Sequence, residues 1–262
     1  MATNRKIYPV NHWLRSSEPA RALAVYLEQQ GKAYSRVKNA HIEELLGDLR
    51  GRSFLDYGCG GGRFLVHAAR QAASLVVGVD AEPMVLATAR YFLQQEGLED
   101  RCQLLESEKF PAASLQTRFD LVLLKDVIEH VEDDQELLAN AAQSLAERGY
   151  LILSTQNSCS LNYLFQGNYH RVWCQNQDWW GWDPTHLRFY NPASLGRKLE
   201  RAGLRPVAWR AAYLVPYKFP APASSPKQFI RFDSLSWLDR VLGRIWPFNR
   251  LGWNIIIKAA TY

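Results

Sequence analysis

Residues 53–64 form the run Ser53-Phe54-Leu55-Asp56-Tyr57-Gly58-Cys59-Gly60-Gly61-Gly62-Arg63-Phe64. A short apolar segment enters a turn that holds four glycines, and a helical pattern follows from Arg63 to Gln71. This order predicts a buried strand, a tight turn and a helix start. Glycines allow a ligand to approach the backbone closely, and the free N–H groups of a helix start face that ligand. We therefore expect a ligand site at this turn.

Two acidic residues end the strands of this region. Asp56 precedes Gly58 by two residues, and Asp80 closes the next apolar run, 24 residues after Asp56. An acid at the end of the second strand is placed to accept both hydroxyls of a ribose. Asp56 is placed to accept from an ammonium group, whereas a dinucleotide would bring a pyrophosphate that has no use for this carboxylate. S-adenosylmethionine carries a ribose and an ammonium and no phosphate, so it fits both acids.

Four segments resemble the motifs of the class I S-adenosylmethionine-dependent methyltransferases. In chain order, the four segments are Asp56–Gly62, Val79–Met84, Phe119–Val131 and Arg148–Leu153. The resemblance covers residues 50–157 and returns near 184–205. It points to the small-molecule branch of the family (types 11 and 23), with similarity to the ubiquinone-pathway O-methyltransferases. It implies the fold and the cofactor, and it says little about the substrate.

The alternation of apolar runs and helical patterns predicts an α/β fold with a ligand at the carboxyl edge of a parallel sheet. The resemblance implies a Rossmann-like seven-stranded sheet with helices on both faces and an antiparallel last strand. We expect strands at 53–57, 75–79, 102–106, 119–124, 149–155, 204–210 and 253–259. We expect core helices near 62–72, 83–96 and 134–147, and a further helix that Asn191 caps and that runs from Pro192 to Ala202.

The chain divides into two predicted parts. Residues 1–50 form an N-terminal helical extension, with helices expected at 19–30 and 35–49, which either lids the cofactor or only covers the sheet. Residues 51–262 form the methyltransferase domain, with an insertion at 157–191 and a C-terminal helix and strand at 232–260. The segment 214–227 is rich in Pro, Ala and Ser and is expected to be a loop.

The amino-acid composition limits which types of protein the chain can be. The chain has 262 residues, of which 47% are hydrophobic and 22% charged, as in ordinary globular proteins. A net charge of +5 permits contact with anionic lipid or nucleic acid without requiring it. The four cysteines are scattered without metal-ligand spacing, which favours a reducing cytoplasm. We expect a cytoplasmic protein, with peripheral contact at a membrane surface left open.

The resemblance assigns the cofactor contacts to residues at the strand ends. The glycine-rich turn and the acid before it would hold the methionine part, and the second acid would hold the ribose. Glu106 stands where the family usually has Asp, beside the adenine. The full set is Asp56, Gly58, Cys59, Gly60, Asp80, Ala81, Met84, Glu106, Ser107 and Lys125.

The run Asp126-Val127-Ile128-Glu129-His130 follows the fourth predicted strand. Spacings of three and four residues would place Asp126, Glu129 and His130 on one helical face. These side chains could hold a divalent metal, or His130 could act as a general base. Ubiquinone-pathway O-methyltransferases carry a similar run, associated in that family with magnesium. The alternative is a helix start that is hydrogen-bonded and binds no metal.

Residues 157–191 form a long insertion with a high aromatic content. A loop of this length inside a domain is usually functional or disordered, and the aromatic side chains argue against disorder. We expect it over the carboxyl edge of the sheet, where flat apolar walls suit an aromatic, prenylated or glycan substrate. The predicted substrate contacts are Trp173, Trp179, Trp180 and Tyr190. The alternative is a local hydrophobic core that stiffens the insertion.

His186 is the first candidate for a catalytic base, with His130 and Asp126 as further catalytic candidates. The run Asp183–Pro192 around it resembles a segment of small-molecule and glycan methyltransferases. Methyl transfer is a displacement at an activated carbon, so a base is needed only to take the proton of a hydroxyl or amine acceptor. A neutral imidazole suits that task. Alternatively, His186 anchors the loop to Asp183 or to a backbone carbonyl.

The run 232–246 is predicted to form a short amphipathic helix that carries Arg240 and Arg244. It either docks on the domain or rests on a membrane surface. Its apolar positions are Leu235, Trp237, Leu238, Val241, Leu242 and Ile245.

These features favour an enzyme that transfers the methyl group of S-adenosylmethionine to a small molecule, chiefly at an oxygen. Enzymes that methylate base amines usually end the fourth strand with an acid-Pro-Pro-aromatic run, and this chain has Leu124-Lys125-Asp126-Val127 instead. This difference argues against a nucleic-acid partner. Two alternatives remain: a methyltransferase for RNA or protein, and a protein that binds the cofactor without transferring its methyl group.

Overall fold

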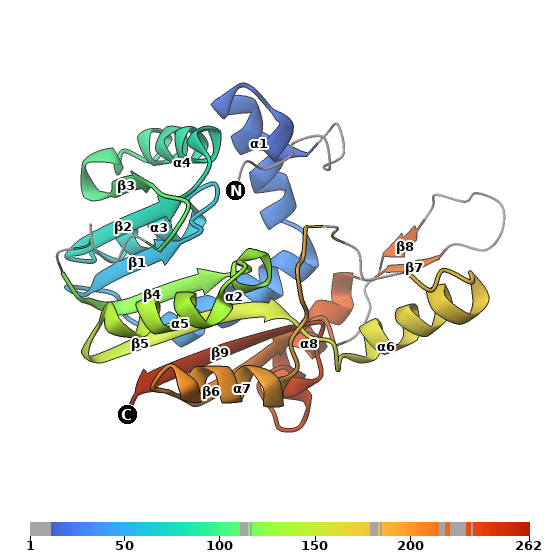
Figure 1. Ribbon diagram of the computed structural model, residues 1–262. Helices are drawn as coiled ribbons and strands as arrows, with labels where there is room; N and C mark the ends of the chain where they lie inside the picture. The colour runs from blue at the N-terminus through green and yellow to red at the C-terminus, as the bar shows by residue number, and fades with distance from the viewer. Residues whose placement is uncertain are drawn as a thin grey trace.

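The computed structural model describes residues 12–110, 115, 117–178, 183, 185–214, 218–220, 229–231 and 233–262. Within them lies a seven-stranded sheet of order β3-β2-β1-β4-β5-β9-β6 (Figure 1). Its strands are β1 Ser53–Tyr57, β2 Leu75–Asp80, β3 Gln103–Glu106, β4 Phe119–Lys125, β5 Leu145–Gln156, β6 Leu204–Ala212 and β9 Asn254–Thr261.

The strand directions confirm the predicted fold class. β1 pairs in parallel with β2 on one side and with β4 on the other, so the strand order reverses between β1 and β4. β9 runs antiparallel between β5 and β6. In open α/β sheets, ligands bind at the carboxyl ends of the strands where the order reverses. The glycine-rich turn after β1 lies at that point.

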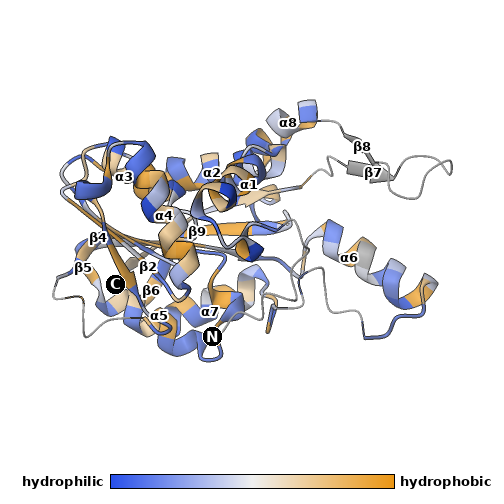
Figure 2. Cartoon of the chain, turned by 90° about the horizontal axis from the view of Figure 1, so that it is seen from above, coloured by the Kyte–Doolittle hydropathy of each residue, from blue (hydrophilic) through white to orange (hydrophobic). Residues whose placement is uncertain are grey.

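Helices cover both faces of the sheet, each with its own hydrophobic core. Figure 2 shows α2 and α3 on one side and α5 and α7 on the other. Alternate side chains of β1 pack into the two cores, because successive side chains of a strand point to opposite faces. The helices are α1 Pro19–Gln30, α2 Ala33–Leu46, α3 Arg63–Arg70, α4 Pro83–Gln95, α5 Asp134–Gln143, α6 Leu161–Asn168, α7 Pro192–Arg201 and α8 Ser236–Leu242.

Local sequence accounts for several helix starts. Pro stands in the first turn of α1, α4 and α7, where its missing N–H costs nothing. Asn191 caps α7 by accepting from the Ser194 amide at 2.8 Å. The expected helix 134–147 was too long at its C-terminal end. α5 ends at Gln143, and the chain enters β5 at Leu145, which pairs with Phe119 of β4.

Two predicted loops contain regular structure. The insertion begins with α6 and a π-helical turn, Tyr169–Trp173, and α6 projects away from the sheet (Figure 1). The segment 214–227, expected as a loop, contributes β7 Lys218–Pro220, which pairs with β8 Phe229–Arg231. The insertion returns to the domain at an isolated bridge between Asn157 and Tyr190.

Tyr190 belongs to the core rather than to a substrate wall. Its side chain is 2% exposed, and its hydroxyl donates to Asp134 Oδ2 at 2.7 Å. Lys198 Nζ also binds Asp134, at 2.7 Å. The prediction that Tyr190 contacts the substrate was wrong, because the side chain turns inward and ties the end of the insertion to α5.

Substituting Tyr190→Phe tests this role. Removing a buried hydroxyl that donates to a carboxylate is expected to lower the free energy of unfolding by about 1.5 kcal/mol. Urea denaturation followed by circular dichroism measures it. Tyr262→Phe is the matched control, because that side chain is 79% exposed and its hydroxyl should contribute nothing measurable. Equal midpoints for the two variants would contradict the assignment.

Candidate functional site

The turn after β1 adopts a backbone that requires glycine. Gly58, Gly60 and Gly62 have φ of +76°, +54° and +84°. A Cβ on Gly58 would lie 2.4 Å from Val127 Cγ2, so this position also lacks the space for a side chain. The amides of Gly58 and Cys59 donate to Val79 O at 2.8 and 3.0 Å, which fixes the turn against β2. These bonds fix the turn at the carboxyl edge of the sheet.

Asp56 is a buried carboxylate that lacks a full set of partners. The residue is 2% exposed, and its Oδ1 has no hydrogen-bond partner among the described residues. Burial raises the pKa of Asp56 to about 7, against the opposing charge of Lys125, and Asp80 adds to the rise. Such a group is stabilised when a cation binds it. An ammonium group of a ligand is the kind of partner that this carboxylate lacks.

Asp80, predicted to hold a ribose, ends β2 and accepts hydrogen bonds from backbone amides. Its Oδ2 accepts from the Gly60 amide at 3.0 Å and its Oδ1 accepts from the Glu82 amide at 3.3 Å. Each oxygen keeps a lone pair for a further donor. In the sheet Asp80 is the register partner of Glu106, and the Ser107 amide donates to Asp80 O at 3.0 Å. The residues predicted for ribose and adenine therefore meet at neighbouring strand ends, and Ala81 and Met84 follow directly along the chain.

The N-terminal helices pack against the glycine-rich turn. The ring of Tyr26 lies so close to Gly61 that a Cβ there would come within 2.7 Å of it. Trp13 packs on Tyr26 with ring centroids 5.1 Å apart, and its ring lies 3.9 Å from where a Cβ of Gly60 would stand. The extension thus covers the predicted cofactor turn directly.

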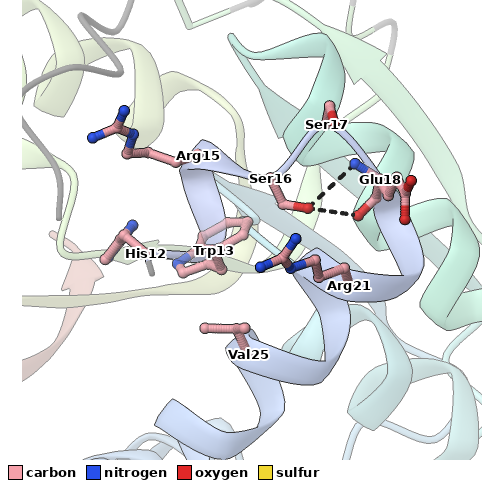
Figure 3. A pocket seen from close by; sticks show the side chains of 8 residues that line it. All are labelled: His12, Trp13, Arg15, Ser16, Ser17, Glu18, Arg21 and Val25. Carbon is pink, nitrogen blue, oxygen red and sulfur yellow. Dashed lines mark hydrogen bonds between the residues drawn. The ribbon is translucent and has the colours of Figure 1, made fainter. Parts of the chain in front are cut away.

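A pocket of about 380 Å³ opens between the Trp13–Arg15 turn and α1 (Figure 3). It contains none of the predicted site residues. Trp13 lines this pocket and also approaches Gly60, so the pocket borders the predicted cofactor site. Its lining residues are His12, Trp13, Arg15, Ser16, Ser17, Glu18, Arg21 and Val25.

Asp126 lies at the centre of an ion-pair network that the sequence did not reveal. Its Oδ2 pairs with Lys38 Nζ from α2 and lies 3.2 Å from Lys125 Nζ. Its Oδ1 accepts from Ser154 Oγ at 3.0 Å. Burial would raise the pKa of Asp126, but Lys38 and Lys125 hold it well below its ordinary value. Lys38 also donates to Asn254 Oδ1 at 3.2 Å, so the network joins α2, β4, β5 and β9.

The predicted helical face of Asp126, Glu129 and His130 was wrong. Asp126 has φ of +56°, which interrupts any helix there, and only a 3₁₀ turn follows at Ile128–His130. The carboxylate of Asp126 turns toward the two lysines. The three side chains therefore do not share one face.

His186 joins Glu129 and His130 instead. Ligand atoms of these three residues all lie within 4.8 Å of one another. The two imidazole rings meet edge to face with centroids 4.7 Å apart. Glu129 is 1% exposed, and burial, with the charge of Asp126, raises its pKa to about 8. Sequence spacing could not show this cluster, because His186 is 56 positions beyond His130.

His186 is a neutral imidazole at pH 7. Burial and neighbouring His130 together lower its pKa to about 4, against the charges of Asp183 and Asp126. Its Nε2 stands 3.7 Å from Asp183 Oδ2, in line with the anchoring alternative. A neutral ring can accept a proton, but a pKa near 4 makes it a weak base at pH 7.

The aromatic side chains that the structure places beside His186 are not the ones predicted to contact the substrate. Phe189 contacts the His186 ring at 5.7 Å between centroids, and Tyr163 stacks on Trp253 at 6.0 Å. Trp173, predicted to face the substrate, is 82% exposed. Trp179 and Trp180 lie outside the described residues. No spacing signal linked Tyr163 and Trp253, which come from distant parts of the chain.

Comparison with known proteins identifies the family. A family model described as a methyltransferase domain matches residues 21–208. The chain belongs to that family. A ubiquinone biosynthesis O-methyltransferase of Ruegeria sp. is 35% identical over 162 residues, which cover 60% of this chain and 62% of the relative. The corresponding protein of Alkalilimnicola ehrlichii is 34% identical over 125 residues, covering 48% and 50%. The chain thus spans less than two thirds of either methyltransferase.

Solved structures agree with the fold. The magnesium protoporphyrin IX methyltransferase of Synechocystis PCC 6803, solved with bound S-adenosylhomocysteine, aligns with a TM-score of 0.56 at 16% identity, covering 98% of this chain and 92% of that one. A Haloferax volcanii methyltransferase, solved with its activator Trm112, aligns with a TM-score of 0.60 at 14% identity, covering 94% and 98%. At these identities the likeness concerns the methyltransferase fold alone.

The raised pKa of Asp56 predicts how cofactor affinity varies with pH. Below about pH 7 the carboxyl gains a proton and loses its attraction for the ammonium group of S-adenosylhomocysteine, so affinity should fall about tenfold for each pH unit. Above about pH 7 the affinity should level off. Calorimetric titration between about pH 5.5 and pH 8 measures this profile. Asp56→Asn should bind weakly with a flat profile, and a flat profile in the unmodified protein would refute the assignment.

Proposed function

We propose that this methyltransferase-family chain transfers the methyl group of S-adenosylmethionine to an oxygen of a small aromatic, prenylated or glycan acceptor. The observation that carries the proposal is Asp56, a buried carboxylate with an unpartnered oxygen beside a glycine-rich turn. It would receive the ammonium group, while Asp80 would receive the ribose hydroxyls. The curated relatives that support an oxygen acceptor are named as ubiquinone biosynthesis O-methyltransferases.

The bound cofactor supplies a methyl group that is already activated by its sulfonium. The chain contributes position, because a displacement at such a carbon depends mainly on alignment of the acceptor. We assign the cofactor contacts to Asp56, Gly58, Cys59, Gly60, Asp80, Ala81, Met84, Glu106, Ser107 and Lys125. Asp126 takes a positioning role, since its carboxylate holds Lys38 and Lys125 in place.

We assign activation of the acceptor oxygen to His130 and His186. Both rings lie at the carboxyl edge, one after β4 and one in the returning segment of the insertion. Phe189 and Trp253 supply apolar surface beside them, which suits a flat or lipophilic acceptor. Trp173, Trp179 and Trp180 remain assigned to the outer part of the substrate path.

A labelling experiment tests this function. The purified chain is incubated with methyl-labelled cofactor and an extract of its own source cells, and the label is followed into organic solvent, soluble small molecules and precipitated polymer. Label is expected in the organic or small-molecule fraction. Asp80→Ala is the blank, and His186→Asn should reduce the rate by about 10²–10⁴-fold while leaving S-adenosylhomocysteine binding intact.

The other fractions distinguish the alternatives. Label in the precipitate would overturn the proposal in favour of an RNA or protein substrate, and such activity should weaken as salt rises. No label above the blank, with cofactor binding intact, would favour a protein that binds S-adenosylmethionine without transferring its methyl group.

The exposed aromatic side chains support contact with a membrane surface that presents a lipophilic acceptor. Phe165 and Trp173 are 73% and 82% exposed, and Trp237 and Trp246 are 64% and 74% exposed. α8 itself docks on the domain, because Asp239 accepts from the Tyr213 and Leu214 amides at 2.7 Å each. The docked helix thus still presents Trp237 outward. In the described residues no helix is long and apolar enough to span a bilayer.

Vesicle binding tests this contact. Cosedimentation with vesicles that contain an anionic lipid is expected to be stronger than with neutral vesicles, because the net charge is +5. The double substitution Trp237→Ser and Trp246→Ser should remove most of the binding. Val207→Ser on β6 is the control, since it removes an apolar side chain that is 42% exposed elsewhere on the surface. Equal losses in both variants, or none in either, would count against the proposed surface.

A further inference from the structure

The magnesium site implied by the Asp126-x-x-Glu129-His130 run does not fit the structure. Magnesium prefers oxygen ligands and water in octahedral geometry. Asp126 would be its main anionic ligand, yet Lys38 and Lys125 already neutralise that carboxylate and Ser154 occupies its other oxygen. A cation at Asp126 would have to displace two ammonium groups.

We propose that Glu129, His130 and His186 form a binding site for a zinc-type divalent cation. Their ligand atoms lie within 4.8 Å of one another, and the residues come from two separate segments of the chain. The segments are fixed to each other, because the Leu187 amide donates to Glu129 O at 2.8 Å. The cluster therefore depends on tertiary structure, and it replaces Asp126 with His186.

Each of the three side chains has a neighbouring polar group that can orient it. Thr155 Oγ1 donates to Glu129 Oε2 at 2.9 Å, and Thr185 Oγ1 lies 3.2 Å from His130 Nδ1. Asp183 stands on the Nε2 side of His186, at 3.7 Å. Protein metal sites use such outer partners to orient their ligands and select the histidine tautomer. We assign Glu129 Oε1 to the cation, together with one ring nitrogen from each of the two histidines.

Glu129 gives an independent indication of a missing ligand. The side chain is almost fully buried, at 1% exposure, and among the described residues its Oε1 has no hydrogen-bond partner. Burying a carboxylate oxygen without a partner is costly. A cation between this oxygen and the two imidazoles would satisfy it.

The chemical types of the three ligand groups indicate which class of metal they would bind. Two imidazoles and one carboxylate suit zinc and other first-row transition metals, whereas magnesium seldom takes nitrogen ligands. Bonds of about 2.1 Å in tetrahedral geometry place donor atoms about 3.4 Å apart. Because the ligand atoms here lie within 4.8 Å of one another, the side chains need to close by up to about 1.4 Å. Three protein ligands leave a fourth position open, as in zinc sites that bind a water or a substrate oxygen. With the cation bound, the two imidazoles would serve as ligands, and the cation would take over from them the activation of the acceptor oxygen.

Cobalt provides the direct test, because Co²⁺ in a tetrahedral nitrogen and oxygen site absorbs visible light. The full-length protein is stripped with a chelator and titrated with Co²⁺. We expect one equivalent to bind, Zn²⁺ to displace it, and excess Mg²⁺ to leave the spectrum unchanged. The affinity should fall by about 100-fold or more in Glu129→Gln, His130→Asn and His186→Asn. Asp126→Asn tests the alternative ligand set, because a loss of affinity there with retention in His186→Asn would place the cation at Asp126. His170→Asn changes a partly exposed histidine outside the cluster, and as the matched control it should keep its affinity.

X-ray absorption of the Zn²⁺-loaded unmodified protein gives a second measurement that needs no variant. Two imidazole ligands are expected, whereas the set that contains Asp126 has one. The proposal is overturned if no equivalent of Co²⁺ or Zn²⁺ binds, if only one imidazole is found, or if Asp126→Asn abolishes binding while His186→Asn retains it. These readouts do not use methyl transfer, so their failure leaves the proposed function standing, and the reverse is also true.

Discussion

The ion pair between Lys38 and Asp126 is the interaction on which the site depends. It connects α2 of the N-terminal extension to the end of β4, and Asn254 and Ser154 add the ends of β9 and β5. Lys38 is a buried residue, so its charge needs a partner at this depth. Without Lys38 the carboxylate of Asp126 would lose one of its two cationic partners. Without Asp126 the buried ammonium would keep only Asn254 and the face of the Tyr34 ring as described partners. The extension is therefore part of the site's construction rather than a separate cover.

Two buried acids at the same sheet edge differ in how the cost of burying their charge is balanced. Asp126 has its cations built in, which holds its pKa low. Asp56 has only the more distant charge of Lys125, and its pKa rises from 3.8 to about 7, a cost of about 4 kcal/mol for the charged form. A ligand ammonium can recover part of that free energy. The charge of Asp126 is thus balanced by lysines of the chain itself, whereas the charge of Asp56 can be balanced by a ligand.

The sequence predicted the sheet and the glycine-rich turn well because both depend on local patterns. Glycines with positive φ, acids at strand ends and Pro or Asn at helix starts are visible within a few residues, and the structure places Asp56, Asp80 and Glu106 as these patterns indicate. The acceptor side was predicted poorly. Lys38, Thr155 and Trp253 carry no local signal, since each becomes relevant only through contacts with distant segments.

The errors after β4 have one physical origin. The spacing of Asp126, Glu129 and His130 suggested a helical face, but the positive φ of Asp126 turns the chain at the strand end. That turn sends Asp126 toward the lysines and leaves Glu129 and His130 facing the returning end of the insertion. Tyr190 then closes the arrangement, because its buried hydroxyl fixes that end to α5. The insertion therefore has two structural parts: its returning end brings His186 beside Glu129 and His130, while Phe165 and Trp173 in its helical part stay exposed.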